Sequence, residues 1–212
     1  MQGKEVRAVT ETTAVPVDCR RSTKPLLLVD FDGVLNDWNG HIDEYGWGVA
    51  GWRRSQVVDG DDTKEWCYRP IFRKWLTRLA DRFEMLWCTG RDETAPQLFG
   101  PQLGAADWPV VSTCGPGNDD LWRGTRMWKL PVVAMYLDSR GNPPQAILDD
   151  EADVPARAWA AARPTPTLIV ALRWGLAWRH VRALEQWADG LEQPEPQYGL
   201  RPLPCGSAGS GR

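Results

Sequence analysis

The sequence predicts an α/β fold, a three-layer Rossmann-like sandwich built on a mostly parallel sheet. Its strands are expected in short apolar runs without alternation, at 26–29, 83–88, 145–148 and 167–172. Runs of this kind are typical of strands that are buried on both faces of a parallel sheet. Segments with helical spacing separate them, and an alternation of strands and helices favours crossover connections within one parallel sheet.

Composition divides the chain into a folded domain at 25–191 and two tails. Residues 1–24 are polar and mixed in charge, with no apolar stretch of the kind found in signal peptides, and are expected to be irregular. Residues 192–212 are rich in Pro, Gly and Ser, which predicts a disordered tail. No apolar run approaches the length of a membrane span, so we expect a cytoplasmic protein without a membrane partner.

The stretch 36–68 is expected to form a small flap. It is rich in Gly, Asp and Trp and carries no helical period, which favours a β-hairpin with its turn near Asp59-Gly60. Residues 70–83 follow with apolar positions on one helical face, behind Pro70 as a start signal. Because that helix belongs to the core, too few residues remain for a separate cap domain.

The second half of the chain predicts the remaining elements. Asp153 and Pro155 are residue types that favour the start of a helix. We expect a short strand at 109–111 and helices at 129–136, 153–163 and 176–191.

Charge and cysteine content exclude some classes of protein. The formal net charge is −3, so any contact with nucleic acid must use a local patch rather than a global basic field. The five cysteines are scattered and form no CxxC pair, which argues against a zinc site or a disulfide framework. Reduced thiols in a cytoplasm are the plain interpretation.

Acidic residues follow two of the predicted strands directly. Asp30 and Asp32 come after 26–29, and Asp149 and Asp150 come at the end of 145–148. Ligands of an open parallel sheet bind at the carboxyl ends of its strands, so these acids are expected to share one crevice. Two carboxylates about 4 Å apart repel by roughly 4 kcal/mol at an effective dielectric constant of 20, which calls for protonation or a cation.

Oxygen ligands favour Mg²⁺ over zinc, and Mg²⁺ bound by carboxylates usually also holds phosphate oxygens. The sequence therefore predicts a magnesium site that receives a phosphorylated substrate. The alternative is a plain turn at Asp30 and Asp32 and a helix cap at Asp149 and Asp150. Either pair alone would fit this alternative as well, whereas two pairs that each directly follow a buried strand favour the shared site over it.

These stretches resemble the motifs of the haloacid dehalogenase (HAD) superfamily. The apolar run that ends in Asp30-Phe31-Asp32-Gly33 is similar to its first motif, and Met85 to Gly90, ending in Thr89-Gly90, to its second. Lys129 resembles the lysine of the third motif, and Ala146 to Asp150 the fourth. The set occurs in the order of the family.

The resemblance implies a two-step phosphoryl transfer and a role for each acid. Asp30 would attack phosphorus and form an aspartyl-phosphate, and Asp32 would protonate the leaving group and then activate water. Thr89 would offer its hydroxyl to a phosphate oxygen. Lys129 would offset negative charge, although Arg123 or Arg126 could take that place.

The resemblance also implies the ligands of the ion and of the substrate. Mg²⁺ would be bound by Asp30, the backbone carbonyl of Phe31 and Asp149, with Asp150 either a direct ligand or a neighbour of one. Substrate binding would involve Gly90 through its backbone N–H, and Gly33 would let the backbone turn sharply under the site. Arg91, as a cation near the site, could clamp a substrate phosphate.

A closer resemblance covers 25–191. Asp149-Asp150-Glu151, 159–163 and 166–170 are similar to the HAD domains of "Swiss Army knife" RNA repair proteins, of the type found in actinobacterial and phage proteins. It implies a nucleic-acid end as substrate and no obligate protein partner. The chain departs from that group at Arg91, where an aromatic residue is expected. A phosphatase for a small metabolite or nucleotide, and an idle binding module of the same fold, stay open as alternatives.

Tryptophan is unusually frequent, with 13 residues. Those of the flap, with nearby arginines, could stack bases and clamp phosphates, or they could pack the flap onto the domain. The flap residues in question are Trp47, Trp52, Trp66, Arg53, Arg54 and Arg69. We expect Trp75, Trp87, Trp159 and Trp187 in the core.

Overall fold

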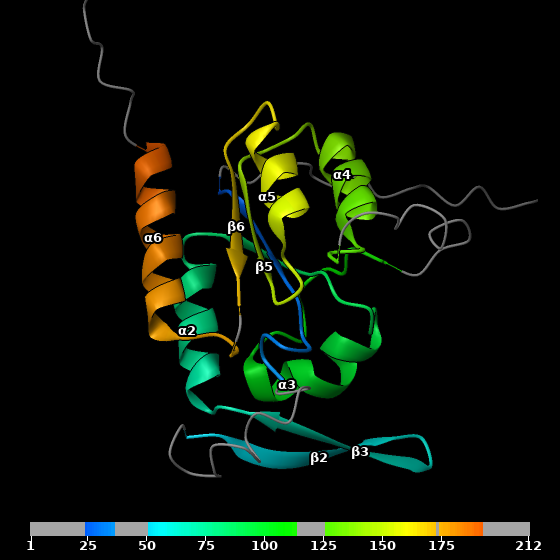
Figure 1. Cartoon of the computed structure of the whole chain (residues 1–212). Helices are drawn as coiled ribbons and strands as arrows, with labels where there is room; N and C mark the ends of the chain where they lie inside the picture. Colours follow the sequence, from blue (N-terminus) through cyan, green and yellow to red (C-terminus); the bar gives the residue numbers. More distant parts are fainter. Residues whose placement is uncertain (1–23, 37–50, 114–125, 173, 193–212) are drawn as a thin grey trace, which may run out of the picture.

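The computed structural model describes residues 24–36, 51–113, 126–172 and 174–192 (Figure 1). The expected N-terminal tail, the C-terminal tail after residue 192 and residues 37–50 of the flap therefore lie outside the described residues, as does Arg123.

A four-stranded sheet in the order β4-β1-β5-β6 forms the centre of the protein. Its strands are β1 (Leu26–Val29), β4 (Glu84–Trp87), β5 (Gln145–Asp149) and β6 (Thr167–Ala171). Every pairing within this sheet is parallel, and Val29 lies opposite both Trp87 and Leu148. This confirms the predicted α/β class and the four predicted strands. It also sets the carboxyl ends of β1, β4 and β5 level with one another.

Helices cover both faces of the sheet, which gives the three expected layers (Figure 1). Helices α2 (Ile71–Ala80) and α6 (Trp178–Glu192) pack on one face, and α4 (Leu130–Ser139) and α5 (Val154–Ala161) pack on the other. Within β1, Leu27 and Val29 belong to the first core cluster, whereas Leu26 and Leu28 belong to the second. Since each side chain of β1 enters one core or the other, the strand has no polar face and its sequence does not alternate.

The start of α5 shows why that helix forms where the sequence predicts it. The carboxylate of Asp153 accepts a hydrogen bond of 3.0 Å from the backbone N–H of Ala156, so it caps the helix as expected. Pro155 lies in the first turn, where the missing N–H costs nothing.

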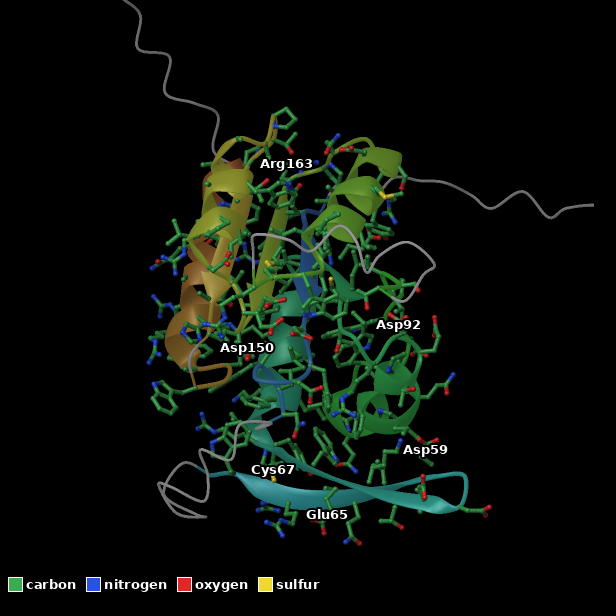
Figure 2. All side chains as sticks on the ribbon, turned by 45° about the vertical axis from the view of Figure 1, so that its right-hand side comes forward. Asp59, Glu65, Cys67, Asp92, Asp150 and Arg163 are labelled. Carbon is green, nitrogen blue, oxygen red and sulfur yellow. The ribbon has the colours of Figure 1, made fainter. Side chains whose placement is uncertain are left out.

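The flap hairpin is confirmed for its described part. Strands β2 (Arg53–Asp59) and β3 (Asp62–Tyr68) pair in antiparallel register around a turn in which Gly60 has φ +63°. The hairpin lies beyond the carboxyl ends of the sheet strands (Figure 1), and Figure 2 shows Asp59, Glu65 and Cys67 along it.

Packing explains the described tryptophans of the flap. Trp66 is buried, stacks on Tyr68 at 4.3 Å between ring centroids, and lies 5.6 Å from the Phe31 ring. Trp52 is half-buried and meets Phe72 edge-on at 5.6 Å. Of the tryptophans expected in the core, Trp87 is fully buried, but Trp75, Trp159 and Trp187 only lie against the core with part of their surface exposed.

One segment has structure that the sequence did not predict. A π-helical turn, η1 (Ala95–Phe99), runs into the short helix α3 (Gly100–Leu103), and both bury their apolar residues. The strand expected at 109–111 is reduced to one bridge between Val110 and Trp87. None of the helices in the described ranges has the length and apolar character that crossing a membrane requires.

Candidate active site

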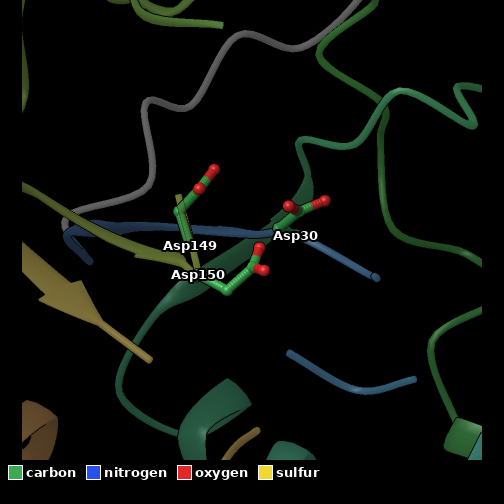
Figure 3. Close-up of side chains that lie close together, drawn as sticks. All are labelled: Asp30, Asp149 and Asp150. Atoms are coloured by element: carbon green, nitrogen blue, oxygen red, sulfur yellow. The ribbon is translucent and has the colours of Figure 1, made fainter. Parts of the chain in front are cut away.

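The two acid-tipped strands lie side by side, as predicted. Strands β1 and β5 are neighbours, and the backbone N–H of Asp30 donates to the carbonyl of Leu148 at 3.0 Å. Carboxylate oxygens of Asp30, Asp149 and Asp150 all lie within 4.8 Å of one another (Figure 3). The parallel register of the sheet therefore brings residues about 120 positions apart in the chain into one acidic cluster.

Lys129 is the cation at the centre of this cluster. Its Nζ lies 2.5 Å from Asp30 Oδ2, 2.8 Å from Asp149 Oδ2 and 3.4 Å from the carbonyl of Cys88. The side chain is buried, so Lys129 is not a solvated surface lysine. Burial alone would lower the pKa of Lys129, but the carboxylates of Asp30 and Asp149 outweigh burial and raise it.

Burial and neighbouring negative charge raise the pKa values of Asp30 and Asp150. Burial, opposed by Lys129 and reinforced by Asp149, raises the pKa of Asp30 to about 7. Burial and the charge of Asp149 also raise the pKa of Asp150. When all the carboxylates are ionised, one ammonium faces three negative charges, and this excess suits a divalent cation with oxygen ligands.

The expected role of the Phe31 carbonyl in binding metal is not supported. This oxygen accepts hydrogen bonds from the backbone N–H groups of Leu35 at 2.8 Å and Asn36 at 2.9 Å, with Val34 at 3.3 Å. Its lone pairs are thus used inside the turn that follows β1, and the carbonyl is engaged there rather than offered to an ion. The N–H of Phe31 donates instead to Asp30 Oδ1 at 2.7 Å.

Gly33 makes the expected sharp turn, with φ +71°, and also lies against Asp150. A Cβ at this position would come within 2.1 Å of Asp150 Oδ2, so no side chain fits there unless Asp150 moves. Gly33 is not among the described residues that line the pocket at the site, and its direct effect is on the position of Asp150 rather than on a substrate.

Asp32 is held by two partners. Arg91 donates to both of its carboxylate oxygens, at 2.7 and 3.1 Å, and the Asn36 side chain donates to Oδ1 at 2.7 Å. The Arg91 guanidinium also lies 5.4 Å from the Phe31 ring centroid and 5.6 Å from that of Phe99. We expected Arg91 to clamp a substrate phosphate, but the structure directs it to Asp32, and the pocket lining found in the described residues does not include it.

A polar pocket of about 300 Å³ opens over these groups. Thr89 and Gly90, at the end of β4, lie on its wall as expected, and Thr89 is buried. A Cβ on Gly90 would come 3.1 Å from the Trp128 ring, so glycine keeps this wall close to the tryptophan. The pocket is lined by Asp30, Asp32, Thr89, Gly90, Arg126, Trp128, Lys129, Asp150 and Glu151.

Hydrogen bonds from Thr113 hold the loop that carries Thr89 in place. Asp92 has φ +41°, an uncommon conformation for a residue other than glycine, and its Oδ1 accepts a 2.7 Å hydrogen bond from the N–H of Thr113. The Thr113 hydroxyl lies 3.1 Å from the Thr89 carbonyl. Figure 2 shows Asp92 on the side of the molecule away from Asp150, so this network supports the loop without facing the acids.

The sequence analysis assigned no role to several residues of the site. Glu151 and Trp128 line the pocket, and Asn36 and Asp92 hold the two loops in place. Arg126, which the sequence offered as an alternative to Lys129, also lines the pocket, but Lys129 is the residue paired with Asp30 and Asp149. Glu151 follows Asp149-Asp150 directly and Trp128 precedes Lys129, so adjacency to a motif was the available signal. Nothing in the local sequence distinguishes Asn36 or Asp92 from ordinary turn residues.

The fold and the site together define an α/β protein with a buried lysine–carboxylate cluster at the carboxyl edge of a parallel sheet. Comparison with known proteins adds no relative: no protein-family model matches the chain, and its sequence matches no curated protein.

Proposed function

We propose that this chain is a magnesium-dependent phosphomonoester hydrolase of the HAD type, with a Rossmann-like fold, that acts on nucleic-acid ends through an aspartyl-phosphate on Asp30. The observation that carries the proposal is the position of Asp30, which lines the pocket, is ion-paired with Lys129, and has a second acid, Asp32, two residues further on. An idle binding module has no need for this arrangement.

The first half-reaction uses Asp30 as the nucleophile. One carboxylate oxygen forms a bond to phosphorus while the bond from phosphorus to the ester oxygen breaks, and Asp32, which must be protonated for this step, gives its proton to the departing oxygen. Arg91 and Asn36 fix the direction of the Asp32 carboxylate, which matters because proton transfer requires hydrogen-bonding distance.

The second half-reaction returns the enzyme to its starting state. Water attacks phosphorus, Asp32 takes the proton of that water, and the Asp30 carboxylate leaves as inorganic phosphate forms. Thr89 and the N–H of Gly90 line the same pocket and supply donors to the phosphoryl oxygens, and Lys129 offsets charge as it shifts between Asp30 and phosphate.

The donor set fits Mg²⁺, because Asp30, Asp149 and Asp150 offer clustered carboxylate oxygens and an excess of negative charge. Bound there, the ion would supply positive charge to the phosphoryl oxygens.

The choice of a nucleic-acid end rests on the resemblance to RNA repair domains. The pocket of about 300 Å³ is at the low end for ligand pockets and has room for a terminal phosphate, which a nucleic-acid end and a small metabolite both offer. The thiol of Cys88, which forms no disulfide, suits the reducing cytoplasm that we propose as the setting.

Hydrolysis of p-nitrophenyl phosphate with Mg²⁺ tests the chemistry. We expect turnover by the native chain and a loss of at least about a thousandfold in Asp30→Asn, which keeps the size of the side chain but removes the nucleophile. Chelation of the ion should abolish turnover and its return should restore it. Turnover that is unchanged in Asp30→Asn, or absent in the native chain, would remove the proposal. Faster phosphate release from mononucleotides than from oligonucleotide ends would leave the chemistry but remove the substrate.

A further inference from the structure

A second hollow surface lies outside the catalytic pocket, on the face covered by α2 and α6. A groove of about 890 Å³ runs along α2 to the start of α6, from Pro70 and Ile71 to Trp178. A smaller hollow of about 400 Å³ beside the flap shares Pro70 and Ile71 with it and extends to Trp52. We call the two together the α2 groove.

The α2 groove is basic although the whole chain is acidic. Arg53, Arg69, Arg73 and Lys74 line it, and none of them has a carboxylate partner within the described ranges. A further cation, Arg78, is neutralised by an ion pair with Glu185, and Asp81 is the one acid in the described lining. Arg53, Arg73 and Lys74 are exposed, whereas Arg69 is half-buried with its guanidinium 5.4 Å from the Trp75 ring centroid. Cations gathered at the start of α2 and on the neighbouring end of β2 provide a local site for a polyanion.

Aromatic rings run along the same groove. Successive ring centroids are 5.6 Å apart from Trp52 to Phe72, 5.8 Å from Phe72 to Trp75 and 6.0 Å from Trp75 to Trp178. Phe72 is buried, but Trp178 keeps 41% of its surface exposed and Trp52 and Trp75 are half-buried. The guanidinium groups of Arg69 and Arg78 each lie 5.4 Å from a ring centroid, of Trp75 and Trp178 respectively, so bases would stack on the part of each ring that these arginines leave exposed. Cations interleaved with partly exposed tryptophans suit single-stranded nucleic acids, because the phosphates meet charge and the unpaired bases stack on rings.

The flap end of the groove is in contact with the catalytic loop. A Cβ on Gly175 would lie 3.2 Å from the Trp52 ring and 3.3 Å from the carbonyl of Val34, so these three residues pack together. Val34 belongs to the turn that carries Asp30 and Asp32, and its carbonyl accepts a 2.8 Å hydrogen bond from the N–H of Leu176.

We propose that the α2 groove binds single-stranded nucleic acid and so leads its terminal phosphate toward the pocket at Asp30. Only the delivery of the terminal phosphate to Asp30 rests on the proposed function, because binding in the groove requires no catalysis. Among polyanions, a duplex keeps its bases stacked internally and an acidic peptide has no bases, so neither uses the tryptophans.

Fluorescence anisotropy of a short fluorescein-labelled oligo(dT) strand, with the full chain in EDTA at low salt, tests the binding. We expect a dissociation constant on the order of micromolar, weakening as salt rises. Arg73→Glu should weaken binding about five- to tenfold and make it less dependent on salt. The matched control is Arg157→Glu, an exposed arginine of α5 on the opposite face, which should bind as the native chain does.

Trp178→Ala should weaken binding about fivefold or more through lost stacking, and Trp178→Phe should recover part of it. Thermal melting of each variant distinguishes loss of binding from loss of fold. Equal effects of Arg73→Glu and Arg157→Glu, equal binding of duplex DNA or polyglutamate, or no binding by the native chain would overturn the proposal. Binding without turnover of p-nitrophenyl phosphate would support the groove and reject the phosphatase, and turnover without binding would do the reverse.

Discussion

Replacing Lys129 with methionine removes a buried cation that touches two carboxylates, while it keeps most of the side-chain volume. Each of the contacts, at 2.5 and 2.8 Å, is worth about 6 kcal/mol of attraction at an effective dielectric constant of 20 before the cost of desolvation. Measured losses on breaking one partner of a buried ion pair are about 3–5 kcal/mol, because the remaining charges stay buried without compensation.

For a chain of this length each kcal/mol lowers the melting temperature by about 2–4 °C, so we expect Lys129→Met to melt about 6 to 20 °C below the native chain at neutral pH without metal. Differential scanning calorimetry in EDTA measures this. Lys74→Met, the same change at an exposed lysine of α2, is the matched control and should melt within about 2 °C of the native chain.

The pH dependence gives a sharper test. The pKa of Asp30 is raised from 3.8 to about 7, so this carboxyl contributes stability fully below its unfolded pKa, and the contribution is lost as pH rises through about 7. Lys129 lowers that pKa, so it rises further in Lys129→Met. The substitution should therefore cost less at about pH 5, where Asp30 is protonated, than at about pH 8. An equal cost at both values, or a cost under about 1 kcal/mol, would refute this account of the cluster.

Three further substitutions test other parts of the site. In Gly33→Ala, alanine must adopt φ +71° and its Cβ must displace Asp150. We expect the free energy of unfolding to fall by about 2 kcal/mol or more in calorimetry, and Mg²⁺ to bind more weakly in a titration. Unchanged Mg²⁺ affinity would refute the link to Asp150. Arg91→Met should lower kcat about ten- to a hundredfold, and more for an alkyl phosphate than for p-nitrophenyl phosphate, because the poorer leaving group needs the proton of Asp32; equal losses on both substrates would show a merely structural role. Asp153→Ala removes the cap of α5 and also the 2.8 Å hydrogen bond that Asp153 Oδ2 accepts from the N–H of Arg126, so it should lower the free energy of unfolding by about 1 kcal/mol or more in urea, and Asp153→Asn should recover part of the loss; an unchanged midpoint for Asp153→Ala would refute the role of the cap.

The strands could be predicted from the sequence because the apolar runs that mark them have a local cause. Each residue of β1 enters a core on one face or the other, and an unbroken apolar run is the direct result. The acids at the strand ends were readable for a related reason, since parallel strands bring their carboxyl ends to one edge. Sequence reasoning therefore predicted that Asp30 and Asp149 would meet.

Other parts of the site depend on contacts that leave no local trace. The pairing of Arg91 with Asp32 joins residues that are far apart in sequence, and it replaces the phosphate contact that we expected. The Phe31 carbonyl was assigned to the metal because the path of the turn after β1 was unknown, and in that turn it accepts backbone N–H groups. The π-helical turn η1 was missed because Pro96 and Gly100 read as loop residues, although Phe99 anchors the turn in the core.

The adjacency of β1 and β5 has a consequence for when the acidic cluster can form during synthesis. The halves of the cluster are separated by more than half of the chain, and they meet only through one of the longest-range strand pairings of the sheet. A nascent chain that has not yet released β5 from the ribosome carries Asp30 without Asp149, so Lys129 has only one of its two carboxylate partners. Translation must therefore pass Asp150 before the cluster can assemble, and a product truncated earlier would lack it.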